Sequence, residues 1–272
     1  MIISSTAPSS GSRSNMGAQH AIPMSAAFLK HESSEHDLRR HDGRFSSSLQ
    51  DIHGLLRLDR TSKPWETCGF EPRFQHRRFK AGEFIYRMGQ AFSVLYIVRF
   101  GFLKTVLRNP QGDERILSFP MRGDLLGFDG ICHNRYTSDT AALTDSELIT
   151  VRFKELLTPG HANGELEQMI YRAASREIAL ERCGTGLSIT VKSEARVARF
   201  LAMQARRYTD MGYSSSNFLL PMTRRDLGSY LGLTLETVSR SLSALAGAGA
   251  IVVNRRDIRI LKPELLSSDS HA

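Results

Sequence analysis

The stretch from Met222 to Leu245 reads Met-Thr-Arg-Arg-Asp-Leu-Gly-Ser-Tyr-Leu-Gly-Leu-Thr-Leu-Glu-Thr-Val-Ser-Arg-Ser-Leu-Ser-Ala-Leu. It carries the signals of two short helices joined by a tight turn. Thr223 is a favourable N-cap residue, and Asp226 three positions later favours a helix N-terminus. Gly232 ends the first helix, and Thr234 can cap the second. The pattern therefore predicts a helix-turn-helix.

The second of these helices has an apolar face and a polar face. Its apolar residues repeat at helical spacing, and we expect them in the core: Leu235, Val238, Leu242 and Leu245. Glu236, Ser239 and Arg240 share another face because they are three and four residues apart. Arginine can fork onto guanine, glutamate can accept from cytosine, and serine can bond either way. This face predicts base readout; the alternative is an ordinary helical hairpin with solvated charges.

A basic turn follows the two helices. Arg255 and Arg256 stand between the apolar runs 251–253 and 258–261, which predicts a β-hairpin wing with both arginines near phosphate. Residues 192–264 hold twelve basic and six acidic side chains, a balance that favours DNA. The predicted DNA-contacting residues are Thr223, Arg224, Thr234, Glu236, Thr237, Ser239, Arg240, Arg255 and Arg256.

Composition narrows the class of protein. The 272 residues carry 36 Lys and Arg against 28 Asp and Glu, and the net charge of +8 favours nucleic acid over a membrane surface as partner. The three cysteines have no zinc-ligand spacing, and they suit a reducing cytoplasm. The N-terminus has no signal-peptide pattern, no apolar run reaches membrane-spanning length, and no phosphate-binding loop or nucleophile elbow indicates an enzyme.

The rest of the chain divides into three parts, and the predicted fold class is α+β. Residues 1–60 are Ser- and His-rich without apolar periodicity, so we expect a disordered extension, with a regulatory arm as the alternative. Residues 61–160 show short apolar runs separated by glycines, which predicts a jelly-roll (β-roll) sensor domain. A dimerisation helix is expected over 161–190 and a winged helix-turn-helix over 191–265.

A seam of residues at 3-4-3-4 spacing runs along the expected dimerisation helix. Its members are Leu166, Met169, Ala173, Arg176, Leu180, Cys183 and Leu187. The polar Arg176 interrupts the seam. We favour a helix that pairs with a second copy, because a helix-turn-helix commonly reads two half-sites through a two-fold dimer. The alternative is a helix packed on its own domain.

At this point the sequence resembles the CRP/FNR family of bacterial transcription regulators, over roughly residues 74–262. The motifs that carry the resemblance are Gly123–Asp129, Met222–Asp226 and Tyr230–Arg240. The resemblance is strongest to the subgroup of the fumarate-and-nitrate-reduction regulator (FNR) and FixK-like proteins, in which Glu-x-x-Ser-Arg reads TTGAT half-sites; TGTGA, the CRP site, is the weaker expectation. It also implies a homodimer and an activator that contacts RNA polymerase. The Asn109–Glu114 turn is one candidate contact, with a solvated loop as the alternative.

Two cofactors of the family have no matching residues here, so none is predicted. FNR holds an iron–sulfur cluster with an N-terminal cysteine triplet and one roll cysteine, but residues 1–67 have no cysteine and the roll position is Ile149. The arginine that pairs with the phosphate of cyclic AMP is missing from the stretches 127–129 and 136–137. A haem- or small-molecule-responsive sensor stays open as the alternative function.

The expected dimer would not depend on a cofactor. By resemblance, Cys183 replaces an acidic residue that opposes dimerisation in FNR until its cluster forms. A small apolar thiol there predicts a standing dimer. Cys183 could instead form a redox-sensitive disulfide with its symmetry mate, but a packed, inert thiol is favoured.

Overall fold

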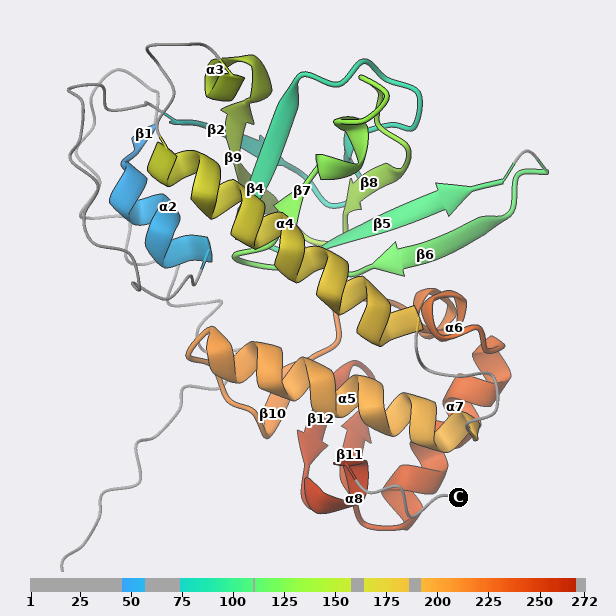
Figure 1. The fold of residues 1–272 in the computed structure, drawn as a ribbon. Helices are drawn as coiled ribbons and strands as arrows, with labels where there is room; N and C mark the ends of the chain where they lie inside the picture. Colours follow the sequence, from blue (N-terminus) through green and yellow to red (C-terminus); the bar gives the residue numbers. More distant parts are fainter. Residues whose placement is uncertain (1–45, 57–73, 110, 158–163, 186–191, 268–272) are drawn as a thin grey trace, which may run out of the picture.

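The computed structural model describes residues 46–56, 74–109, 111–157, 164–185 and 192–267 (Figure 1). A β-rich domain is followed by a long helix and then by a C-terminal domain of helices and a small sheet. This is the α+β architecture predicted from the sequence. Within these ranges no helix is long and apolar enough to cross a membrane.

Two antiparallel sheets build the β-domain. The first has the order β1 (Ser46–Ser47), β2 (Phe74–Phe79), β9 (Ser146–Arg152), β4 (Val94–Phe100) and β7 (Leu125–Leu126). The second has the order β3 (Phe84–Tyr86), β8 (Asp139–Ala142), β5 (Leu103–Arg108) and β6 (Glu114–Ser118). Two short helices complete the domain, η2 (Phe128–Gly130) after β7 and α3 (Phe153–Leu157) after β9.

Strand β4 is buried on both of its faces. Successive side chains of a strand point to opposite sides, so Tyr96 and Val98 enter one hydrophobic cluster while Leu95 and Ile97 enter another. The first cluster fills the β-domain, and the second lies under the helices that cover it. The helices are therefore part of the same core as the sheets.

The end of the predicted disordered extension is folded, so that prediction is wrong for residues 46–56. Helix α2 (Leu49–Leu56) starts at a cap in which Ser48 N donates to the Asp51 carboxylate at 2.8 Å. Ile52, Leu55 and Leu56 are three and four residues apart and are buried in the second cluster. The short apolar face was hidden by the neighbouring serines. Residues 1–45 lie outside the described part of the chain.

Helix α4 (Gly164–Thr185) packs on the β-domain through the predicted seam. Leu166, Met169 and Ala173 are 4%, 3% and 0% exposed and belong to the same cluster as α2. These three residues therefore face their own domain, and the interpretation of them as a partner-facing seam is wrong. Leu187 and the side chain of Cys183 lie outside the described residues.

The C-terminal domain starts with α5 (Ser193–Asp210). It continues with β10 (Asn217–Leu219), α6 (Arg224–Leu231), α7 (Leu235–Gly247), β11 (Ile251–Asn254), β12 (Asp257–Ile260) and α8 (Glu264–Ser267). The strands form an antiparallel sheet in the order β10-β12-β11. The core is shared by all of these elements, with Phe200, Leu231 and Ile258 among its buried members.

Candidate nucleic-acid interface

Helix α6 begins with a reciprocal cap, as its sequence predicts. Asp226 N donates to Thr223 Oγ1 at 3.0 Å, and Thr223 N donates to the Asp226 carboxylate at 3.0 Å. Lys104 of β5 forms an ion pair with the same carboxylate at 2.9 Å. Burial raises the pKa of Asp226, but hydrogen bonds from Thr223 and Lys104 outweigh it and leave that pKa below its usual value. The hydroxyl of Thr223 is therefore engaged in the cap.

The turn between α6 and α7 depends on two glycines. Gly232 has a φ of +63°, in the left-handed region that favours glycine. A Cβ atom on Gly228 would lie 2.6 Å from the carbonyl oxygen of Leu233, so only glycine fits this close approach. Thr234 then caps α7 by accepting from Thr237 N at 3.1 Å. The start of α7 is thereby fixed relative to α6.

The two predicted faces of α7 separate as expected, with one exception. Val238, Leu242 and Leu245 are buried. Leu235 was predicted in the core but is 40% exposed, and it is the first residue of the helix.

The polar face of α7 is open. Glu236 and Arg240 are exposed, and Ser239 between them is half-buried. Arg224 Nη1 from the start of α6 donates to Ser239 Oγ at 3.3 Å, and Arg240 Nη2 reaches Thr237 Oγ1 at 3.5 Å. Arg224 therefore lies beside the triplet, which the sequence spacing could not show.

The wing is a tight hairpin between β11 and β12. Asn254 pairs with Asp257, so Arg255 and Arg256 form its two-residue tip. Arg255 has a φ of +55° and is exposed. Arg256 is also exposed, but its Nη1 donates to the carbonyl of Pro221 at 3.2 Å. Both predicted arginines are thus at the tip, and Arg255 is the more freely presented.

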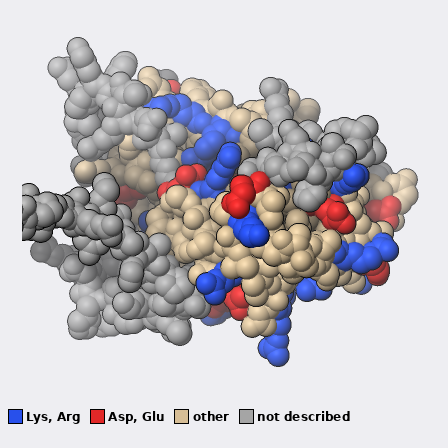
Figure 2. All heavy atoms as spheres, turned by 90° about the horizontal axis from the view of Figure 1, so that it is seen from below, with Lys and Arg blue, Asp and Glu red and all other residues tan. Residues whose placement is uncertain are grey.

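Charge is mixed over the described part of the face seen from below (Figure 2). Figure 2 shows Lys and Arg side chains spread over the face seen from below, with Asp and Glu between them.

Comparisons with known proteins agree with this geometry. Residues 195–268 match the Crp-like helix-turn-helix domain, and residues 76–158 match the cyclic nucleotide-binding domain. The transcriptional regulatory protein Btr of Bordetella pertussis is 37% identical over 184 residues, covering 68% of this chain and 76% of that protein. The chain belongs to the CRP/FNR family.

Other CRP/FNR proteins give the same result. The fumarate and nitrate reduction regulatory protein of Escherichia coli is 34% identical over 186 residues, which cover 68% of this chain and 74% of that protein. The structure of FixK2 from Bradyrhizobium japonicum aligns with a TM-score of 0.63 and 26% identity, covering 71% of this chain and 95% of FixK2. The resemblance to the FNR and FixK-like members is therefore confirmed.

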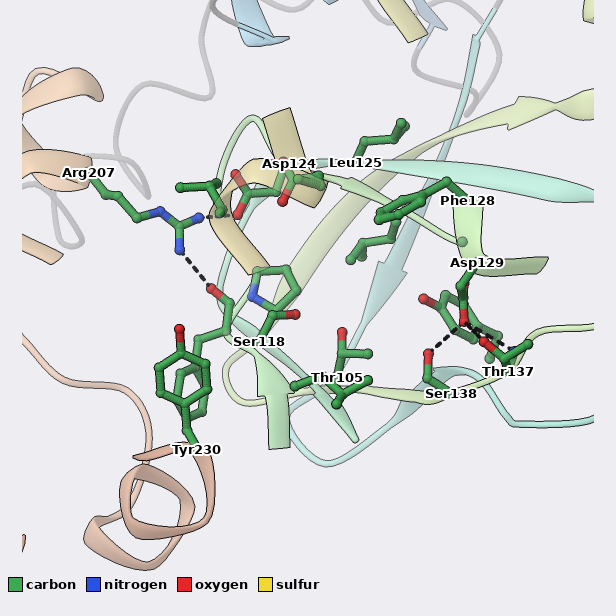
Figure 3. A pocket seen from close by; sticks show the side chains of 18 of the residues that line it. Thr105, Ser118, Asp124, Leu125, Phe128, Asp129, Thr137, Ser138, Arg207 and Tyr230 are labelled. Atoms are coloured by element: carbon green, nitrogen blue, oxygen red, sulfur yellow. Dashed lines mark hydrogen bonds and ion pairs between the residues drawn. The ribbon is translucent and has the colours of Figure 1, made fainter. Parts of the chain in front are cut away.

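Carboxylates line the cavity of the β-domain of this CRP/FNR protein. Asp129 Oδ2 accepts from Thr137 N, Thr137 Oγ1 and Ser138 Oγ at 3.1, 2.9 and 2.8 Å (Figure 3). An internal carboxylate thus takes donors that a phosphate oxygen would use. The arginine in the cavity lining, Arg207, is paired with Asp124. A phosphate placed here would meet carboxylates without a cation of its own.

The chain has fewer cysteines than an iron–sulfur cluster of the FNR type uses. Such a cluster takes about four thiolates, whereas the whole chain has three cysteines. Ile149 is 1% exposed in the core, and Cys132 is exposed on the surface. In the described part of the chain, no group of three or more His, Cys, Asp or Glu side chains is placed to hold a metal ion. Cys68 lies outside the described residues.

Proposed function

We propose that the chain is a transcription regulator that binds an inverted repeat of TTGAT half-sites as a homodimer. The observation that carries the proposal is the open polar face of α7. Glu236 and Arg240 project from a helix whose start is fixed by a cap and a glycine turn, and Ser239 lies between them. A rigid helix of this kind can place three side chains against base edges without further ordering.

Each group of this face has a partner in the half-site. Arg240 can donate two hydrogen bonds to a guanine, and Glu236 can accept from a cytosine amino group. Arg224 and Arg255 are exposed at its edges and suit phosphate contacts, which set register rather than sequence. The helix N-terminus at Thr234 adds backbone N–H groups and a favourable dipole for phosphate. Thr237 lies beside Arg240 and supports its position.

The dimer is proposed to form through the side of α4 opposite its buried face. Tyr171 is 66% exposed and Ile178 is 42% exposed, and they lie two turns apart on one stripe with Ser175 between them. Large exposed apolar side chains on a helix commonly mark an interface. A second copy of α4 is the occupant that this stripe suits, because two recognition helices must bind a two-fold DNA site.

Activation is proposed to use the β5–β6 hairpin. The tip of this hairpin projects from the β-domain, and Asn109 Nδ2 donates to Asp113 at 2.9 Å. A preformed turn at the tip of a hairpin is accessible to RNA polymerase bound beside the regulator. The protein would act on DNA in the cytoplasm and carry out no catalysis itself.

A second candidate is a sensor in which a small molecule gates DNA binding. One observation favours it, a cavity of about 240 Å³ that the β-domain shares with α4 and α5. The described histidines do not line this cavity, so haem ligation there has no support from its residues.

Selection from a pool of randomised duplexes with the purified full chain tests the proposed function. We expect enrichment of a TTGAT inverted repeat with half-sites about 10–10.5 base pairs apart, centre to centre. A TGTGA repeat would contradict the proposed readout. A pool without any enriched sequence would contradict sequence-specific binding by the chain alone.

Replacing Arg255 with asparagine should weaken binding to all duplexes alike. Asparagine tolerates the positive φ of this turn, so the hairpin is kept and only the charge is removed. The plot of log affinity against log salt concentration should become shallower by about one unit, the signature of one lost phosphate contact. Anisotropy titrations at several salt concentrations measure the slope. The exposed Arg206 of α5, changed to asparagine, is the matched control, and equal slopes for all three proteins would remove Arg255 from the interface.

A further inference from the structure

The cavity that the β-domain shares with the C-terminal domain brings polar groups from distant parts of the chain together. Asp124 comes from the loop before β7, Glu177 from α4, and Gln204 and Arg207 from α5. In Figure 3, Arg207 points from α5 toward Asp124, with Tyr230 of α6 on the same side. Three separate parts of the fold therefore meet at one buried polar cluster.

An ion pair in this cluster joins α5 to the β-domain. Arg207 Nη2 donates to Asp124 Oδ2, and Arg207 Nη1 donates to the carbonyl of Phe119 at 3.2 Å. The Met121 N–H donates to the same Asp124 oxygen at 2.8 Å. The two charged side chains are 13% and 1% exposed, so water competes little for the pair. The contact fixes where α5 lies against this loop.

The helix-turn-helix is docked on the β-domain next to this ion pair. Lys104 of β5 binds Asp226 of α6, and Ile116 N of β6 donates to Ser229 Oγ of α6 at 3.0 Å. Phe119 packs on Tyr230 with ring centroids 5.3 Å apart. The placement of α6, and with it of α7, thus depends on the same junction.

Helix α4 adds a second carboxylate to the cluster. Glu177 is 14% exposed, and its Oε1 accepts a hydrogen bond from Nη2 of its neighbour Arg176 at 3.3 Å. Arg176 also donates to the carbonyls of Leu56 and Gly123, at 2.6 and 2.5 Å. It therefore holds the end of α2 and the residue before Asp124 against α4.

The charges around Glu177 oppose one another. The titratable groups that face it or its partners are Asp124 from the loop before β7, Arg176 from α4, Arg207 from α5 and Tyr230 from α6. Burial raises the pKa of Glu177 to about 8, and the charge of Asp124 adds to this effect against the two arginines. Glu177 accordingly keeps its proton at neutral pH in the docked arrangement.

We propose that Glu177, Asp124 and Arg207 form a proton-sensitive latch that holds the C-terminal domain on the β-domain. With Glu177 protonated, Arg207 pairs with Asp124 alone, and α5 stays docked. When Glu177 releases its proton to bulk water, a second buried carboxylate faces Asp124. That charge is best relieved by opening the junction to solvent, which separates α5 from the loop and releases α6 from β5 and β6.

The sign of the pH effect follows from linkage. The docked form binds the proton of Glu177 more tightly than the open form, where a solvated glutamate has its ordinary pKa of 4.5. Raising the pH from 4.5 toward 8 therefore weakens the docked form progressively. Above about pH 8 both forms are deprotonated at this position and the effect levels off.

Small-angle X-ray scattering of the full chain across neutral and mildly alkaline pH tests the latch, with light scattering to confirm a constant mass. The radius of gyration of the wild type should grow as the pH rises toward 8 and then level off. Glu177→Gln, which resembles the protonated side chain, should stay compact throughout. A wild type that does not expand, or a Glu177→Gln variant that expands equally, would overturn the proposal.

A matched control and a second measurement separate the latch from general effects of charge. Glu167→Gln removes the same group from the same helix outside the cavity lining, and it should expand like the wild type. In thermal unfolding, Glu177→Gln should have a higher melting temperature than the wild type, and this difference should increase from neutral pH toward pH 8. A difference in melting temperature that is the same at every pH would count against the latch. So would a Glu167→Gln variant whose radius of gyration no longer grows with pH.

Discussion

Replacing Arg240 with alanine lowers the affinity for a TTGAT duplex by about tenfold to a hundredfold, as expected for a bidentate arginine–guanine contact of about 1–3 kcal/mol. Arg240 is exposed, and its contact within the protein is a 3.5 Å approach to Thr237. The free energy of unfolding should therefore hardly change. Fluorescence anisotropy with the specific duplex and with one altered at that guanine measures the effect.

The controls for Arg240 separate readout from charge. Arg206→Ala removes the same charge from an exposed position on α5, and it should affect the two duplexes little and equally. Arg240→Lys keeps the charge without the two-pronged donor, so it should lose discrimination between the duplexes more than total affinity. If Arg240→Ala weakens both duplexes to the same extent, Arg240 contacts phosphate and the assignment is wrong.

Replacing Ile178 with glutamate should convert the proposed dimer to a monomer. At a two-fold interface the new carboxylate would be buried close to its own symmetry copy, and removing a charge from water costs several kcal/mol for each ion. Because Ile178 is 42% exposed in a single chain, the fold of that chain should survive. Light scattering should report a mass near 30.4 kDa, that of one chain.

Ala179→Glu is the matched control for Ile178. It places the same carboxylate on the next residue of α4, about 100° further round the helix, at an exposed position away from the Tyr171 stripe. This variant should remain dimeric. An Ile178→Glu protein that still elutes as a dimer would show that another surface joins the two copies.

The features of the fold that depend only on neighbouring residues were predicted correctly from the sequence. The caps at Thr223 and Thr234, the turn at Gly232 and the exposed pair Glu236 and Arg240 follow from residue type and spacing within about twenty residues, and the structure agrees. These features need no information from elsewhere in the chain. For this reason the helix-turn-helix motif could be recognised from the sequence alone.

The prediction that the seam of α4 faces a second copy was wrong for its buried residues, because α4 has apolar residues on two sides. Leu166 and Met169 have a helical spacing, but so do Tyr171 and Ile178. Periodicity identifies faces without saying which one a β-domain will cover. Only the packing of α2 and the first sheet decides between them, and it covers the side that was assigned to the partner.

The buried cluster was missed for a related reason. Asp124 and Arg207 are 83 residues apart, and neither stands in a pattern that distinguishes it from a solvated charge. Glu177 likewise reads as an ordinary helix-surface residue. Such pairs become visible only when the domains are placed together, because burial and not sequence spacing defines them.

The most direct test of the proposed DNA readout by α7 is fluorescence anisotropy with two duplexes at one fixed salt concentration. One carries an inverted repeat of TTGAT and the other an inverted repeat of TGTGA, and the protein is measured with and without reductant. We predict tight binding to the TTGAT duplex only, through Glu236, Ser239 and Arg240, whether or not reductant is present. Equal, weak and salt-sensitive binding to both duplexes would contradict it.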